Sequence, residues 1–142
     1  MKFLSTLTLT TFLLFSAQAD WNQEEKKINF LLEELGKLDA VFIRNGSEHT
    51  ATEAVSHLRR KLSFGLKSWF TPKKEKWTAI MFIEKLASKS SMSGRPYTIK
   101  FTDGKVVETE QWLKGKLGDY EKRLQKTEEK AQVRKSTHHT PE

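Results

Sequence analysis

The stretch from Thr78 to Gly104 constrains the fold more than any other part of the chain. It joins a strongly apolar segment to a serine-rich loop and then to a short alternating segment that ends in a turn signal. Residues 78–88 predict a helix that is apolar nearly all round, and such a helix is usually central and buried. Its expected inner side carries the apolar residues Ala79, Ile80, Ile83, Leu86 and Ala87, with Met81 and Phe82 on other sides.

The segment after the serine-rich loop has the pattern of a half-buried strand. Tyr97, Ile99 and Phe101 alternate with polar residues, which is the period of a strand with one face in the core. Asp103-Gly104 is a hairpin turn signal, and residues 105–107 are expected to return as the second strand. The sequence therefore predicts one short β-hairpin.

Three further segments have helical signals. Residues 22–38 place apolar side chains at three- and four-residue steps, which predicts an amphipathic helix. Thr50 and Glu53 form a capping box that opens a second helix, running to about Leu62 and ended by Gly65. Thr109 is expected to cap a last helix, whose inward stripe consists of Leu113, Leu117, Tyr120 and Leu124.

Residues 41–46 lie between the first two of these helices. Their three apolar residues are expected to continue into the core, and Asn45-Gly46 is interpreted as a stop, because both residues tolerate left-handed backbone geometry. The expected fold is thus mainly α (α+β), a compact bundle of about four helices with one short β-hairpin.

The N-terminal residues 1–19 have the features of a cleavable signal peptide. Lys2 precedes an apolar and threonine-rich run, and Ser16-Ala17-Gln18-Ala19 supplies a small-x-small cleavage pattern before Asp20. A membrane anchor would need about 20 apolar residues, and this run is shorter. We expect export to the periplasm, a single globular domain at 20–125, and a polar, disordered tail at 126–142.

Composition narrows the classes of function. The chain has no cysteine, which excludes thiol catalysis and cysteine-based metal sites. Its formal charge is +7, and one less without Lys2, which favours anionic partners. Export argues against nucleic acid as the partner, and an anionic envelope component or another periplasmic protein fits better.

Residues 66–77 differ from their surroundings. Four lysines and Pro72 are interleaved with Trp69, Phe70 and Trp77 in a segment that cannot continue a helix. Tryptophan beside lysine is typical of peripheral contacts with membranes, and we consider Trp69, Phe70, Lys73 and Lys74 as a membrane or partner contact. Alternatively, the aromatic side chains fold back into the core while the lysines stay in solvent.

Four short motifs occur in order: FIRNG at 42–46, A-x-x-H-L-x-x-K at 54–61, FIE at 82–84 and S-S-x-S-G-x-P-Y at 90–97. With these motifs the chain resembles an uncharacterised family of small exported proteins of Gram-negative bacteria. The resemblance implies a compact periplasmic domain and brings no assigned activity. The segment 69–77 is longer than the pattern of that family, so a role shared by the family need not include it.

The polar residues of these motifs are the candidates for a ligand-binding site. They are Arg44, Asn45, His57, Lys61, Ser91, Ser93 and Arg95. If their three segments pack together, they form a cleft of cations and hydroxyls that suits a phosphate, sulfate or carboxylate. The alternative is architectural, since the same side chains can pair with the backbone amides of the loops.

A small hydrolase is the competing hypothesis. It would use a serine of residues 90–93, foremost Ser91, with His57 as base and Glu84 or Glu53 to orient the histidine. No G-x-S-x-G motif is present to hold such a serine, and we prefer a non-catalytic binding or scaffold module. The sequence predicts no metal site and no cofactor.

Overall fold

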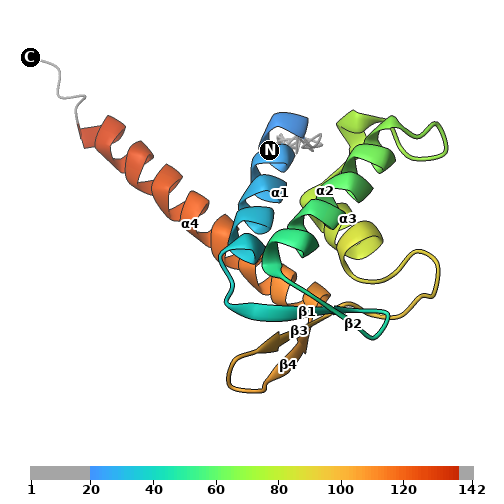
Figure 1. Cartoon of the computed structure of the whole chain (residues 1–142). Helices are drawn as coiled ribbons and strands as arrows, with labels where there is room; N and C mark the ends of the chain where they lie inside the picture. Colours follow the sequence, from blue (N-terminus) through green and yellow to red (C-terminus); the bar gives the residue numbers. More distant parts are fainter. Residues whose placement is uncertain (1–19, 138–142) are drawn as a thin grey trace, which may run out of the picture.

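The computed structural model describes residues 20–137, so the expected signal peptide at 1–19 lies outside the described residues. The elements follow in the order α1 (Trp21–Gly36), β1 (Ala40–Arg44), β2 (Ser47–His49), α2 (Ala51–Lys67), η1 (Lys74–Lys76), α3 (Ala79–Phe82), η2 (Ile83–Ala87), β3 (Thr98–Phe101), β4 (Val106–Glu108) and α4 (Thr109–Thr137). Figure 1 shows the helices on one side of a small sheet, with α4 leading away from it. The expected mainly helical fold with a β-hairpin is confirmed.

The helix predicted at residues 78–88 lies at the centre of the bundle. It consists of α3 and a π-helical turn, η2, and together they contact α1, α2 and α4. Facing it, α1 contributes four fully buried side chains, Ile28, Leu31, Leu32 and Leu35. The prediction that residues 78–88 form the centre of the helical bundle is therefore confirmed.

The inner side of that central helix differs from the prediction at two residues. Phe82 is completely buried, although the α-helical pattern placed it off the inner stripe. Ile80 was expected inside, and 39% of it is exposed. The change to a π-helical turn at Ile83 alters the angular spacing of side chains, and three neighbouring helices cover most of the circumference.

The sheet has four antiparallel strands in the order β2-β1-β3-β4. The predicted hairpin is its β3–β4 half, whereas the β1–β2 hairpin was not predicted. Asn45 and Gly46 have φ values of 52° and 81°, so they adopt left-handed geometry as expected. They connect two strands rather than end a helix, because two consecutive positive φ values match the twist of a tight hairpin.

Gly65 does not end the second helix, which continues to Lys67. Gly65 is buried, and a Cβ built on it would lie 3.2 Å from two ring carbons of Trp77. The Trp77 ring is itself buried, and its Nε1 donates a hydrogen bond to the Pro72 carbonyl at 3.0 Å. The glycine thus provides the space that lets this tryptophan pack on α2.

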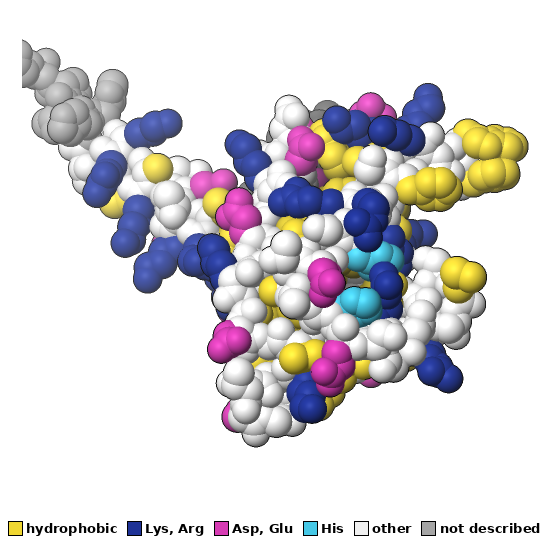
Figure 2. Space-filling model, in the orientation of Figure 1, with side chains coloured by type: hydrophobic (Ala, Val, Ile, Leu, Met, Phe, Trp, Pro, Cys, Tyr) yellow, Lys and Arg dark blue, Asp and Glu magenta, His cyan; other side chains and the backbone are white. Residues whose placement is uncertain are grey.

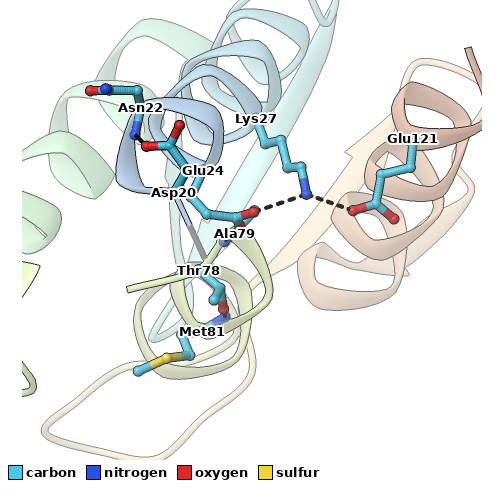
Figure 3. A network of polar contacts seen from close by, with 8 residues as sticks. All are labelled: Asp20, Asn22, Glu24, Lys27, Thr78, Ala79, Met81 and Glu121. Atoms are coloured by element: carbon cyan, nitrogen blue, oxygen red, sulfur yellow. Dashed lines mark hydrogen bonds and ion pairs between the residues drawn. The ribbon is translucent and has the colours of Figure 1, made fainter. Parts of the chain in front are cut away.

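A buried carboxylate fixes the start of the central helix (Figure 3). Glu24 accepts a hydrogen bond from the backbone N–H of Ala79 at 2.7 Å through its Oε2 atom. Its other oxygen pairs with Lys27 at 2.9 Å, and Lys27 also contacts Glu121 of α4 at 3.0 Å. The network therefore connects α1, α3 and α4 and satisfies an N–H that the short helix leaves without a partner.

The segment expected as a disordered tail from Lys126 is helical as far as Thr137, and residues 138–142 lie outside the described part. Residues 122–137 are exposed, and Figure 1 shows this end of α4 projecting from the rest of the molecule. Strong helix formers such as Glu, Lys, Gln and Ala dominate it, and they favour a helix without burial. No helix among residues 20–137 has the length and apolar character required to cross a membrane.

Candidate functional site

A pocket of about 270 Å³ lies between the N-terminal half of α2 and the face of β1. Its walls include the core side chains Phe42 and Leu58. Charged and polar side chains lie at the same pocket, namely Arg44, His49, Thr52, Glu53, Ser56, His57, Arg60, Tyr97 and Thr109. Figure 2 shows the histidine side chains on the surface in this region, beside Lys and Arg. The pocket thus combines an apolar wall with a cationic edge.

His57 is the centre of the polar contacts at this pocket. The Arg44 guanidinium Nη1 lies 2.7 Å from His57 Nδ1, and His57 Nε2 lies 3.2 Å from the Tyr97 hydroxyl. A guanidinium can only donate, so Nδ1 accepts and the neutral ring carries its proton on Nε2. The ring therefore donates from Nε2 to Tyr97, and the two hydrogen bonds fix its orientation.

Burial and neighbouring cations both oppose a charge on His57. Burial is the main cause, followed by the positive charges of Arg44, Lys61, Arg60 and His49, and together they lower the pKa of His57 from 6.5 to about 4. The imidazole is consequently neutral near pH 7, which agrees with its hydrogen-bond pattern. The positive charge of the pocket therefore comes from the arginines.

Lys61 has an architectural role alongside its position near the pocket. Its ammonium group donates to the carbonyls of Leu86 at 2.6 Å and Lys89 at 3.0 Å, and it lies 3.4 Å from the Tyr97 hydroxyl. These carbonyls belong to the C-terminal end of η2 and to the residues after it, where backbone acceptors lack helical partners. Burial, followed by the charge of Arg44, lowers the pKa of Lys61 from its usual value.

Asn45, Ser90 and Ser93 form a separate cluster that connects two loops. The Ser93 hydroxyl donates to Asn45 Oδ1 at 2.5 Å, and Asn45 Nδ2 donates to the Ser90 hydroxyl at 3.3 Å. Ser90 Oγ also accepts from the Ser93 backbone N–H at 3.3 Å. The two ligand-binding candidates Asn45 and Ser93 thus help to hold the β1–β2 turn against the serine-rich loop, together with Ser90.

The remaining candidates lie apart from His57. Ser91 and Arg95 are exposed on the serine-rich loop, and Glu84 forms an ion pair with Lys114 of α4 at 2.9 Å. Within residues 20–137, no serine hydroxyl is hydrogen-bonded to His57, whose two ring nitrogens face Arg44 and Tyr97. The structure therefore brings Arg44, His57, Lys61 and Tyr97 together, and it leaves Ser91 and Glu84 outside this group.

The pocket also contains residues that were not among the ligand-binding candidates, and two of them, His49 and Thr109, have buried atoms that are unpaired within residues 20–137. His49 Nε2 and Thr109 Oγ1 are buried polar atoms without a hydrogen-bond partner in the described part of the chain. Thr109 is the first residue of α4, and its hydroxyl does not cap the helix as expected. His49 belongs to the unpredicted strand β2, where it pairs with Phe42 of β1. Neither position stands out without knowledge of the sheet.

The aromatic segment at residues 66–77 divides into two parts. Trp77 is buried and packs on α2, as the core interpretation predicts. Trp69 and Phe70 are 84% and 79% exposed, so for these two side chains the core interpretation is wrong. Lys73 and Lys74 are exposed beside them.

The described residues bring together no group of three or more histidine, aspartate or glutamate side chains that could hold a metal ion.

Residues 22–121 match a family described as "Family of unknown function (DUF5329)". The "Uncharacterized protein YfeK" of Salmonella typhimurium is 40% identical over 99 residues, which cover 68% of this chain and 77% of that protein. No solved structure matches. The resemblance to an uncharacterised Gram-negative family is confirmed, and the chain belongs to the family of unknown function DUF5329.

Proposed function

We propose that this protein is a periplasmic, non-catalytic binding module whose ligand is a small amphipathic anion. The ligand would occupy the pocket between α2 and β1, with its anionic group at Arg44 and its apolar part against Phe42 and Leu58. The observation that carries the proposal is an arginine that forms no ion pair with any carboxylate of residues 20–137, at the edge of an apolar pocket of about 270 Å³.

The charge balance around Arg44 favours an anionic ligand. Arg44 is half-buried, and its hydrogen bond is to a neutral imidazole. No carboxylate of residues 20–137 lies within the 4.0 Å of an ion pair with it. A guanidinium has five donors in a planar fork, and carboxylate or phosphate oxygens fit that fork with two parallel hydrogen bonds. Arg60 adds a second positive charge at the same pocket, and the one carboxylate in the pocket lining, Glu53, accepts from the Thr50 backbone N–H in the capping box.

The other groups at the pocket suit the same ligand. Phe42 and Leu58 form walls that favour an apolar chain, because covering apolar surface contributes about 25 cal/mol per Å². His49 Nε2 and Thr109 Oγ1 are unpaired buried atoms at this site, and such atoms gain from an added partner. A ligand with both an anionic group and an apolar chain uses both kinds of surface.

The contacts of His57 support binding over hydrolysis. A histidine with a pKa of about 4 is a weak base at neutral pH, and its Nδ1 already accepts from Arg44. A serine nucleophile would have to lie within hydrogen-bond distance of the ring, and Ser91 is exposed on a separate loop.

Export is part of the proposal and rests on the leader sequence. Residues 1–19 have the composition of a signal peptide, and Asp20 caps α1 by accepting from the Asn22 backbone N–H at 3.1 Å. Cleavage before Asp20 would keep this capping residue in the mature chain. Mass spectrometry of the protein from a periplasmic extract tests this directly, and we expect a mature chain that begins at Asp20.

Calorimetric titration with octyl phosphate tests the binding proposal. Octyl phosphate should bind, and octanol, which lacks the charge, should bind at least about tenfold more weakly. Arg44→Gln should reduce the affinity for octyl phosphate by a similar factor, whereas Arg95→Gln, an exposed arginine outside the pocket, should leave it unchanged. Equal binding of both compounds, or equal effects of both substitutions, would contradict the proposal.

A further inference from the structure

The C-terminal end of α2 carries a second surface that is separate from the pocket. Three large aromatic side chains are exposed there, Phe64 by 77%, Trp69 by 84% and Phe70 by 79%. We call these three residues the aromatic tip. In Figure 2 a hydrophobic cluster projects from the molecule where the segment after α2 lies in Figure 1. Three such residues so exposed at one place indicate a surface that makes a contact.

Local hydrogen bonds hold the aromatic tip away from the core. The Thr71 hydroxyl donates to the carbonyls of Gly65 and Ser68, and the Ser68 N–H donates to the Phe64 carbonyl at 3.0 Å. The rings of Trp69 and Phe70 lie against each other with their centroids 3.8 Å apart. The two rings thus form one projecting unit on a turn that is fixed at both ends.

Trp77 explains why these rings do not fold inward. It belongs to the same segment, and it already fills the space beside Gly65 at the end of α2. Its hydrogen bond to the Pro72 carbonyl fixes the returning chain. The place that an aromatic side chain of this segment could take in the core is therefore occupied, and Trp69 and Phe70 remain outside.

The charges next to the aromatic tip identify the kind of surface that it fits. Residues 67–76 contain four lysines and one glutamate. Lys74 lies over the Trp21 ring at 5.0 Å, while Lys67 and Lys73 have no carboxylate of the described residues within 4.0 Å. Exposed tryptophan with free lysines is complementary to the interface of a bilayer, where aromatic rings lie at the level of the headgroups.

We propose that the aromatic tip inserts into the interface of an anionic phospholipid bilayer, with Lys67 and Lys73 contacting the lipid phosphates. The contact is peripheral, because the tip is a short turn and its apolar part reaches only the headgroup region. Since the pocket is lined by the other end of α2, the domain can hold a ligand there while the tip is on the membrane.

Co-sedimentation with vesicles tests this proposal. We expect binding to vesicles of phosphatidylcholine and phosphatidylglycerol at about three to one, and weak binding to phosphatidylcholine alone. Lys67→Ser with Lys73→Ser should reduce the affinity about 25-fold, because each charge contributes about fivefold. Raising the salt to about 0.5 M should act in the same direction, because it screens the phosphates.

The aromatic contribution is tested with a double substitution. Trp69→Ser with Phe70→Ser should weaken vesicle binding by more than about tenfold, while Val133→Ser, an exposed apolar residue on α4, should not. Insertion should shift the tryptophan emission of the parent protein to shorter wavelength, and the double variant should lose this shift. Because both side chains are exposed, the variant should keep the circular dichroism spectrum and Tm of the parent.

Several outcomes would overturn the proposal. Equal binding to neutral and anionic vesicles, or full binding by either double variant, would contradict it. No binding of the parent protein would also contradict it, as would dimerisation through the tip in analytical ultracentrifugation. Arg44→Gln should bind vesicles like the parent, so failure of this proposal and failure of the pocket proposal are distinguishable.

Discussion

Acidification from about pH 7 to about pH 5 should destabilise the protein through His57. The pKa of His57 falls from 6.5 to about 4 in the folded protein, mainly through burial. Between these two values the unfolded chain binds a proton that the folded protein does not bind. The free energy of unfolding therefore decreases as the pH falls below about 6.5, and this loss is complete below about 4.

The size of the effect follows from the two pKa values. A pKa that falls from 6.5 to about 4 corresponds to roughly 2 kcal/mol between about pH 7 and about pH 5. His57 is only half-buried, so water screens the charges of Arg44, Lys61, Arg60 and His49 around it. We therefore expect about 1 kcal/mol in practice.

Urea unfolding at a series of pH values measures this loss. The parent protein should lose about 1 kcal/mol more than His57→Gln over the same interval, since glutamine does not titrate. Ser56→Ala, an exposed residue beside His57 that does not titrate, serves as the control, and it should keep the pH dependence of the parent. If His57→Gln and the parent protein lost the same stability over this pH interval, the claim that the folded protein keeps His57 neutral would be refuted.

Two further predictions concern the packing of the core. Gly65→Ala should destabilise the protein by about 1 kcal/mol in urea unfolding, because the added Cβ would lie 3.2 Å from the Trp77 ring. Gly115→Ala should stabilise the protein by about 0.5–1 kcal/mol, because the added Cβ has no neighbour within 4 Å and alanine favours a helix. Stabilisation by both substitutions would contradict the assigned role of Gly65. Glu24→Ala should cost about 2 kcal/mol in the same assay, because it leaves the buried Ala79 N–H without an acceptor and leaves Lys27 with Glu121 alone. Glu25→Ala should change stability by less than about 0.5 kcal/mol. Equal effects of these two substitutions would refute the role of Glu24.

The helices and one hairpin were predictable because their signals are local. The capping box at Thr50 and Glu53 is present as expected, with the Thr50 backbone N–H donating to Glu53 at 2.8 Å. The alternation that ends at Phe101 and the turn at Gly104 gave the β3–β4 hairpin. Each of these features depends on residues a few positions apart, which a sequence pattern displays directly.

The second hairpin could not be recognised in the same way. Its strand β2 is Ser47–His49, three residues without apolar alternation, and β1 is a continuous apolar run instead of an alternating one. Burial in β1 does not alternate either, because Phe42 is buried and the other four residues are partly exposed. Asn45-Gly46 fits a hairpin turn and a helix end equally well, and only the pairing partner distinguishes them.

Gly65 shows the limit of local signals for packing. A glycine near the end of a helical pattern is typical of a helix terminus, and here it contacts an aromatic ring twelve residues later in the chain. The convergence at the pocket was partly predictable, since His57 and Lys61 are four residues apart on one helix edge. The positions of Ser91 and Glu84 depend on a loop conformation and on the π-helical turn, neither of which has a sequence pattern.

The most direct test of the anion pocket is the pKa of His57, measured by NMR on its ring nitrogens with and without octyl phosphate. An anionic group at Arg44 would favour the charged imidazole, so octyl phosphate should raise the pKa of His57 above its value of about 4, and octanol should not. An unchanged pKa of His57 at saturating octyl phosphate would contradict the account.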